Sequence, residues 1–252
     1  MIRHLRAERK QRQKTKKIRS KSLATKLAIL FRRKGSEPVE MHVSHQPVRS
    51  LFGLNGSRKY LNAAEQKRFR QAVQTLPPEQ RLFCTVLLLS GGRVSEVLSL
   101  TPNAVDVESG NIALKTLKRR KQGVIRQIPL PRQLMYEFEH QFGIGTARLD
   151  PQLRNRPVWP WSRTTAWRLI KRIMELADIV GLAASPKGLR HTFGVSAFQS
   201  NVPPHLVQRW LGHASLRTTA IYAEVSGEEE RRFAARMWNV QITELQRFAE
   251  ID

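Results

Sequence analysis

The hydrophobic pattern of the chain changes period twice, and this change constrains the fold more than any other feature of the sequence. From residue 62 onward the apolar residues recur at helical spacing, except in residues 105–130, where they alternate with polar residues. Helical spacing indicates helices packed on a core, and strict alternation indicates strands with one buried face. We therefore expect a mainly α fold with a small antiparallel β-sheet inserted after the third helix.

Capping residues and helix breakers mark the ends of the expected helices. The first helix begins at the Asn62 cap and ends before Pro77, and a long later helix opens at Ser162. The second helix ends at the Gly91–Gly92 pair, and the third stops at Thr101–Pro102. The helices are expected over residues 62–76, 78–92, 94–100, 132–142, 162–180, 189–200, 203–212, 216–225 and 228–250.

The alternating stretch predicts two consecutive hairpins. Residues 105–114 place Ser109–Gly110 at the turn of the first hairpin. Residues 115–131 supply a strand, a basic turn and then a further strand over residues 124–130.

Positive charge is concentrated at the N-terminus. Residues 1–34 contain 14 Lys or Arg and a single acidic residue, Glu8, so they carry +13 of the formal net charge of +24. This segment has no apolar period and cannot bury a core, and residues 35–57 are rich in Pro, Gly, Ser and His. We expect residues 1–57 to be a basic, largely disordered arm and linker that contacts DNA phosphates, and residues 58–252 to form the folded domain.

Composition and cysteine usage exclude several classes of protein. The net charge suits a polyanion partner, with nucleic acid as the first candidate and an anionic membrane surface as the second. The sequence has no run of 18 apolar residues, so a membrane-spanning helix is not expected. The N-terminal pattern argues against a signal peptide and leaves a mitochondrial presequence as an alternative. The single cysteine, Cys84, excludes an intramolecular disulfide and a Cys-based zinc site, and its apolar surroundings predict a core side chain.

Four positions carry polar side chains where a core pattern would place apolar ones. Arg93 follows the Gly pair, with Glu96 three residues on, and taken alone this spacing favours a structural ion pair. Lys187 and Arg190 share one face of a helix, which by itself is typical of a solvated basic face. The last two positions are His213 and Tyr222. Each of them, taken alone, is more typical of a structural side chain.

Together these positions resemble the tyrosine recombinase/integrase family, which includes phage and integron integrases and the bacterial chromosome-dimer recombinases. SGGRVSEVLSL (residues 90–100) is similar to the first family motif, and LRHTFGVSAFQSNVPPHLVQRWLGHASLRTTAIYAEV (residues 189–225) is similar to the second. TLKRRKQGVIRQIPLP (residues 116–131) resembles the hairpin between them. The resemblance covers about residues 60–240 and implies the tyrosine recombinase catalytic-domain fold.

The resemblance implies a role for the side chains of both motifs. Arg93 and Arg190 would clamp the scissile phosphate, with His213 as a further donor. Tyr222 would attack the phosphorus as the nucleophile. Glu96 would orient Arg93 or a neighbour rather than react.

Two lysine positions complete the set that the resemblance implies. We assign Lys118 as the hairpin lysine that protonates the leaving 5′-oxygen, with Lys115 and Lys121 as alternatives near the same turn. Lys187 stands where family members more often have His, and it would be an acid–base partner.

The implied reaction cuts and rejoins double-stranded DNA through a 3′-phosphotyrosyl intermediate, with no cofactor and no metal ion. The implied function is site-specific recombination for integration, excision or resolution of a mobile element or replicon. The alternatives are strand relaxation like that of a type IB topoisomerase, and sequence-specific DNA binding without catalysis. The resemblance also implies a homo-tetramer on paired sites, accessory DNA-bending proteins, no membrane partner, and a bacterial-type cytoplasmic, nucleoid-associated location.

Both ends of the sequence carry further expectations. Family members have a helical core-binding domain ahead of the catalytic domain, whereas only about sixty residues precede the first expected helix here. This difference fits either a short form of the recombinase or a fragment of a longer ancestor. Residues 228–252 open with three glutamates and are rich in apolar side chains, so we expect them to dock on a neighbouring protomer. The alternative is that they fold back on their own domain.

Overall fold

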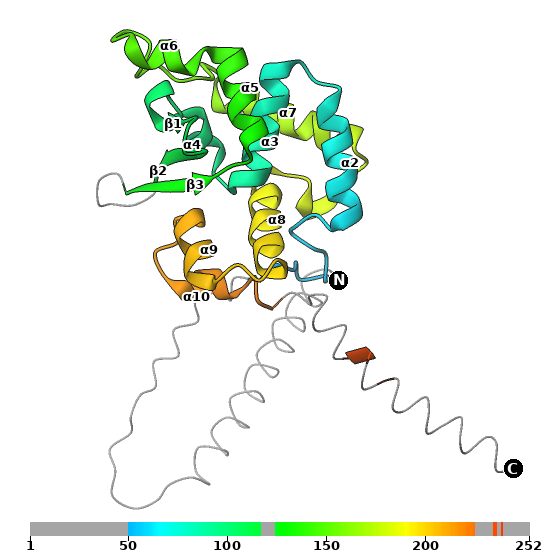
Figure 1. Cartoon of the computed structure of the whole chain (residues 1–252). Helices are drawn as coiled ribbons and strands as arrows, with labels where there is room; N and C mark the ends of the chain where they lie inside the picture. The colour runs from blue at the N-terminus through cyan, green and yellow to red at the C-terminus, as the bar shows by residue number, and fades with distance from the viewer. Residues whose placement is uncertain (1–49, 117–123, 225–233, 236–237, 239–252) are drawn as a thin grey trace, which may run out of the picture. The chain divides into compact units, whose positions relative to one another are not determined.

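The computed structural model describes residues 50–116, 124–224, 234–235 and 238 (Figure 1). The chain divides into two units, Met1–Pro47 and Val48–Asp252, and all described residues belong to the second unit. The predictions for the basic arm up to residue 49, for the basic turn and for most of the C-terminal segment lie outside the described residues. The end of the expected linker is described, and its Leu51 is buried, so this end packs on the folded unit.

Helices make up most of the described part, and the sequence signals set many of their ends. Asn62 and Ser162 accept hydrogen bonds from backbone N–H groups of the helices that follow them. Gly91 ends its helix in the left-handed region, with φ of 60°, where glycine is favoured. The helices are α2 (Ala63–Gln74), α3 (Pro78–Ser90), α4 (Val94–Leu98), α5 (Arg132–Phe142), α6 (Ile144–Leu149), α7 (Arg163–Leu176), α8 (Pro186–Gln199), α9 (Pro204–Leu211) and α10 (Leu216–Ala220), with 3₁₀-helices η1 (Pro102–Ala104) and η2 (Gly181–Ala183).

The β-sheet has three antiparallel strands, which are β1 (Val105–Asp106), β2 (Asn111–Lys115) and β3 (Ile125–Pro129). Both expected hairpins are present, and they share β2, which pairs with β1 on one side and with β3 on the other. The prediction of a mainly α fold with a small antiparallel sheet is confirmed. Along β3 the side chains of Arg126 and Ile128 are buried and that of Ile125 is exposed, so the strand turns an arginine toward the interior.

The buried apolar residues form two clusters. The large core lies among helices α2 to α7 and the sheet, and it includes Phe83, Trp159 and Cys84, which confirms the core position expected for the cysteine. The small core lies between α8, α9, the segment of residues 51–60 ahead of α2 and the turn after α10. The buried members of the small core are Leu51, Tyr60, Val195, Ala197, Val207, Leu211 and Tyr222.

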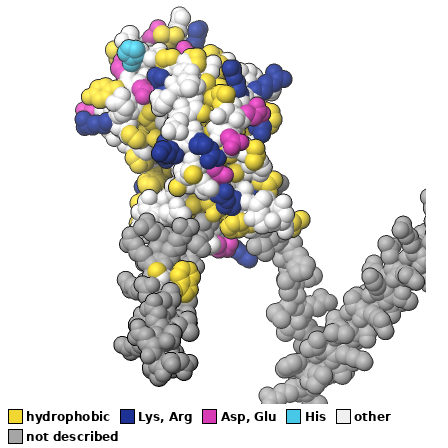
Figure 2. Space-filling view, turned by 90° about the vertical axis from the view of Figure 1, so that its right-hand side faces the viewer, with side chains coloured by type: hydrophobic (Ala, Val, Ile, Leu, Met, Phe, Trp, Pro, Cys, Tyr) yellow, Lys and Arg dark blue, Asp and Glu magenta, His cyan; other side chains and the backbone are white. Residues whose placement is uncertain are grey.

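The surface of the described part carries both signs of charge. On the face in Figure 2, Lys and Arg side chains are interspersed with acidic and hydrophobic side chains, so this face presents no continuous block of one charge. More than half of the formal net charge lies in residues 1–34, outside the described residues. Over the described part, none of the helices combines the length and the apolar character needed to cross a membrane.

Candidate active site

Glu96, in the first turn of α4, lies between two arginines. Its Oε1 accepts a hydrogen bond from Arg93 Nη1 at 2.6 Å, and its Oε2 accepts one from Arg126 Nη2 at 2.5 Å. Burial alone would raise the pKa of this carboxyl, but the hydrogen bonds and charges of Arg126 and Arg93 outweigh burial and lower it. The ionised carboxylate therefore holds both guanidiniums, an arrangement that suits the orienting role predicted for Glu96.

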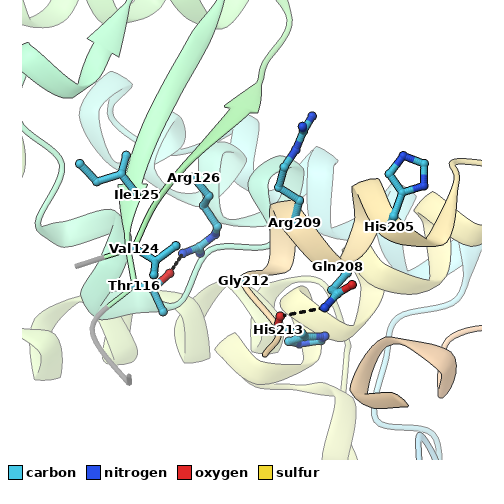
Figure 3. A pocket seen from close by; sticks show the side chains of 9 residues that line it. All are labelled: Thr116, Val124, Ile125, Arg126, His205, Gln208, Arg209, Gly212 and His213. Atoms are coloured by element: carbon cyan, nitrogen blue, oxygen red, sulfur yellow. Dashed lines mark hydrogen bonds between the residues drawn. The ribbon is translucent and has the colours of Figure 1, made fainter. Parts of the chain in front are cut away.

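Arg126 on β3 is a buried arginine that the sequence motifs do not single out. Besides its ion pair with Glu96, it donates from Nε to the carbonyl oxygen of Trp210 at 2.6 Å. It also donates from Nη1 to Thr116 Oγ1 at 2.9 Å (Figure 3). The signal that could have found it is the alternation along β3, because residue 126 shares the inward face with Ile128.

Arg190 on α8 is buried as well. Its Nη1 donates to the carbonyl oxygen of Gly91 at 2.7 Å, and its Nη2 donates to that of Leu211 at 2.5 Å. Burial, followed by the positive charge of Arg93, lowers the pKa of Arg190 to about 10. The guanidinium therefore stays charged at neutral pH, as a phosphate ligand requires.

The C-terminal end of α9 accepts hydrogen bonds from both buried arginines. The carbonyl of Trp210 bonds to Arg126, and the next carbonyl, of Leu211, bonds to Arg190. The last carbonyls of a helix have no partner within it and carry partial negative charge, which cations stabilise. The two arginines therefore fix the chain just ahead of His213, which follows the cap of this helix.

Tyr222 is buried in the small core, with 2 % of its surface exposed. Its ring lies nearly parallel to the ring of His213, with centroids 6.2 Å apart and an interplanar angle of 8°. Its hydroxyl forms a hydrogen bond of 3.2 Å with Nδ1 of His191. The ring also packs on Gly194 of α8, where an added Cβ would lie 2.6 Å from ring atoms, so this position of the ring requires glycine there.

The pKa of Tyr222 is raised above its ordinary value. Burial is the main cause, and the positive charges of Arg190 and Arg93 act in the opposite direction without reversing it. Both guanidiniums favour the phenolate, but in this state desolvation of the phenolate outweighs their attraction. The phenol is protonated at neutral pH and has to lose its proton when it attacks.

His191 is a site residue that the sequence motifs contain without assigning it a role. Burial, followed by the charges of Lys187, Arg190 and Lys59, lowers the pKa of His191 to about 4. The imidazole is therefore neutral at pH 7 and hydrogen-bonded to the hydroxyl of Tyr222. The available signal was its place four residues after Lys187, since side chains at this spacing share one face of a helix.

The chain matches the model of the phage integrase family over residues 59–229, which is more than half of its length. The chain belongs to the phage integrase family. The predicted family resemblance is thereby confirmed, and the matched range includes Arg93, Arg190, His213 and Tyr222. Their individual roles remain predictions.

Relatives of this phage integrase family chain include tyrosine recombinase XerA of Pyrococcus furiosus, which is 29% identical over 181 residues. That match covers 71% of this chain and 61% of XerA, so the chain spans less than two thirds of the length of this relative. The XerH recombinase bound to difH substrate, in a pre-cleavage complex, has a TM-score of 0.56 and 20% identity, covering 74% of this chain and 59% of XerH. The catalytic domain of bacteriophage HP1 integrase has a TM-score of 0.51 and 19% identity, covering 70% of this chain and 93% of that domain. These similarities show the tyrosine recombinase catalytic-domain fold.

The lysines expected at the active site of this integrase-family chain are only partly described. Lys187 is exposed on α8. Lys115 is exposed at the end of β2, where it pairs with Ile125 of β3. Lys118 and Lys121 lie outside the described residues. The choice of hairpin lysine therefore stays a prediction, as does the acid–base role of Lys187.

A pocket of about 240 Å³ opens between the β2–β3 hairpin and α9, next to the arginines of the integrase-family site (Figure 3). It is lined by Thr116, Val124, Ile125, Arg126, His205, Gln208, Arg209, Gly212 and His213. Arginine and histidine side chains on its walls suit a phosphate-bearing ligand. Within the described ranges, no three or more His, Cys, Asp or Glu side chains are placed to hold a metal ion.

Proposed function

We propose that this chain is a site-specific DNA recombinase that cuts and rejoins double-stranded DNA through a 3′-phosphotyrosyl intermediate. The observation that supports it best is the convergence on one tyrosine: Arg190 and Arg93 both act electrostatically on Tyr222, and His213 stacks on its ring. Membership of the phage integrase family supports the same reaction. The relative XerH is bound to its difH substrate in a pre-cleavage complex, which favours DNA as the substrate here.

The chemistry starts with the scissile phosphodiester between the two guanidiniums. Arg93 and Arg190 donate hydrogen bonds to its non-bridging oxygens and neutralise the charge that develops as phosphorus becomes five-coordinate. Tyr222 Oη forms a bond to phosphorus while the bond from phosphorus to the 5′-oxygen breaks. Each donor of this kind is worth roughly 3–4 kcal/mol of barrier by analogy with oxyanion sites.

Two protons move in this step. The hydroxyl proton of Tyr222 passes to a base as its oxygen bonds to phosphorus, and the leaving 5′-oxygen takes a proton from the hairpin lysine, for which we propose Lys118. Rejoining is the reverse reaction with a 5′-hydroxyl as the nucleophile. The phosphotyrosine conserves the energy of the phosphodiester, so the cycle needs no nucleotide cofactor.

The burial of Tyr222 adds a requirement to this mechanism. With 2 % of its surface exposed, the side chain has to leave the small core before its hydroxyl reaches a phosphate. That movement gives up its hydrogen bond to His191 and its stacking on His213. DNA contacts have to compensate for these losses, which ties cleavage to a correctly bound site.

The wider assembly belongs to the same proposal. Two DNA sites would be held by a homo-tetramer in which residues 228–252 dock on a neighbouring protomer, with accessory DNA-bending proteins setting direction. The arm of residues 1–57 would bind phosphates without regard to base sequence. The reaction would take place on chromosomal DNA in a bacterial cytoplasm.

The test is a covalent trap with the full chain. A DNA site selected by the chain from a randomised duplex library is nicked next to the scissile phosphate, so that the cleaved end diffuses away and the phosphotyrosyl adduct accumulates. An adduct with wild type supports the proposal, and its absence on every selected site contradicts it. Strand exchange between two such sites, measured against relaxation of a supercoiled plasmid, separates recombination from topoisomerase-like activity.

A further inference from the structure

Arg126 connects three parts of the proposed active site through one side chain. It bonds to Glu96 on α4, to Thr116 at the end of β2, and to the carbonyl of Trp210 at the end of α9. We propose that Arg126 is a positioning residue that fixes the β2–β3 hairpin against the arginine clamp, so that the leaving 5′-oxygen is protonated. This inference rests on the proposed function and concerns a residue that acts through its neighbours.

Burial makes the contacts of Arg126 obligatory. Its side chain is 2 % exposed, and that of its ion-pair partner Glu96 is 0 % exposed. A guanidinium stays charged in a protein interior, so it requires a counter-charge and an acceptor for each N–H that water cannot reach. The carboxylate, a hydroxyl and a backbone carbonyl supply them, and the elements that carry these three groups are therefore tied together.

The shape of the guanidinium sets how the three elements are spaced. Its donors lie in one plane in a rigid fork, whereas an ammonium is a single flexible donor centre. A lysine at position 126 could pair with Glu96 but could not hold Thr116 and the Trp210 carbonyl at the same time. The placement of the hairpin relative to α4 and α9 therefore depends on arginine at this position.

Thr116 is the point at which Arg126 holds the hairpin. Its side chain is buried, and the turn that contains the predicted lysine follows it directly in the sequence. On the other side of Arg126, the second oxygen of Glu96 holds Arg93. Loss of the Thr116 contact alone would leave the Glu96 ion pairs in place, so phosphate binding and attack would continue while protonation of the leaving group became slower.

The experiment compares two leaving groups on the selected suicide site. In one substrate the leaving atom is the natural 5′-oxygen, and in the other it is a bridging 5′-sulfur, whose thiol has a pKa of about 8.5 and leaves without a proton. For full-length Thr116→Val, we expect adduct formation on the oxygen substrate to slow roughly tenfold, the scale of one lost hydrogen bond. On the sulfur substrate we expect the wild-type rate.

Arg126→Lys is the second variant, and Thr192→Val is the control. Arg126→Lys should slow the oxygen substrate by about a hundredfold, the lower range for loss of general acid catalysis, with most of that loss recovered on the sulfur substrate. Thr192 is a buried threonine whose hydroxyl bonds to backbone groups of Gly188 and Leu61, away from Arg126. Its valine variant should leave the ratio of the two rates at the wild-type value.

Two results overturn the inference. Equal slowing of both substrates by Thr116→Val would mean that attack or binding, rather than protonation, was lost. An unchanged rate of adduct formation on the oxygen substrate would mean that the bond between Arg126 and Thr116 does not position the hairpin. In both cases wild type still forms an adduct, so the proposed function stands. If wild type forms no adduct with either leaving group, the proposed function itself fails.

Discussion

The two cores differ in what surrounds their aromatic rings. In the large core the aromatic rings pack on one another. The ring centroids of Phe83 and Phe138 lie 5.2 and 5.6 Å from that of Trp159. In the small core the ring of Tyr222 lies against two histidines and the bare backbone of Gly194, with Phe198 as its aromatic neighbour. The packing that stabilises the domain is therefore largely separate from the packing that holds the proposed nucleophile. Variants that affect one core and spare the other test this separation.

The largest expected effect is on the chemistry alone. Tyr222→Phe keeps the ring of the small core and deletes only the hydroxyl, so the covalent adduct should be lost completely on the trapped substrate. Its hydrogen bond to His191 is worth about 1 kcal/mol, so thermal unfolding should change little. A variant that still forms the adduct would remove Tyr222 from the role of nucleophile, and one that unfolds at room temperature would contradict the separation.

The second prediction compares the two predicted phosphate ligands. Arg93→Lys and Arg190→Lys should each slow adduct formation by the equivalent of about 3–4 kcal/mol, because an ammonium cannot replace the bidentate fork. Only Arg190 bonds to backbone carbonyls of both Gly91 and Leu211, so its variant should also lose about 2 kcal/mol of unfolding free energy.

Arg93 is the matched comparison, since its side chain is 33 % exposed and, among the described residues, its ion pair is with Glu96. Its variant should lose less than 1 kcal/mol of unfolding free energy. Urea unfolding and single-turnover trapping measure the two quantities. Equal stability losses in both variants would mean that the bonds from Arg190 to the carbonyls of Gly91 and Leu211 add nothing to the unfolding free energy. A variant with the wild-type adduct rate would exclude its arginine from the clamp.

The third prediction is a pH dependence of stability in the small core. His191 has a pKa of about 4 in the folded chain, against 6.5 for an ordinary histidine. Above pH 6.5 it is neutral in both states, whereas between pH 6.5 and 4 only the unfolded state takes up a proton. The contribution of His191 to the unfolding free energy should therefore fall by about 2–3 kcal/mol as the pH drops from 7 to 4.

His191→Gln serves as the reference for this measurement, because it cannot titrate. As the pH falls from 7 to 4, wild type should lose more unfolding free energy than His191→Gln does. A difference that stays constant from pH 7 to pH 4 would mean that His191 is not held neutral by its surroundings.

The smallest expected effect comes from truncating one buried valine in each core. Val86 in the large core and Val207 in the small core are both fully buried. Each Val→Ala change should therefore lower the unfolding free energy of its own core by about 2 kcal/mol. Val86→Ala should lower amide exchange protection throughout the described helices. Val207→Ala should lower it chiefly in α8 to α10. Identical protection patterns would show that the two cores unfold as one.

Local signals in the sequence were sufficient for most of the fold. The caps at Asn62 and Ser162 and the αL position of Gly91 are each decided by a few neighbouring residues, and so is the alternation along the strands. Helix α6 was not predicted because its N-cap is Gly143, the αL cap that ends α5, with neither a capping side chain nor a proline to mark a new helix. The α7 helix ends at Leu176 rather than residue 180, since Asp178 takes a positive φ of 50°.

The site was only partly predictable for a different reason. Motifs supplied the candidate ligands and nucleophile, but the partners of Arg126 are 10, 30 and 84 residues away in the chain. His191 and the hydroxyl of Tyr222 are 31 residues apart. Such contacts depend on how helices and strands pack, which no local pattern encodes. For the same reason the raised pKa of Tyr222 could not be foreseen, because desolvation is a property of the folded core.

The backbone of Gly194 beneath the Tyr222 ring has a consequence for engineering. A methyl group at this position would occupy space that the ring now fills, and α8 is held rigid by its own hydrogen bonds, so the ring would be the part that moves. Alanine, serine and valine at residue 194 would form a graded series that displaces the phenol outward by increasing amounts. Position 194 thus offers a steric control over how readily the tyrosine becomes available, without changing any group that takes part in the reaction.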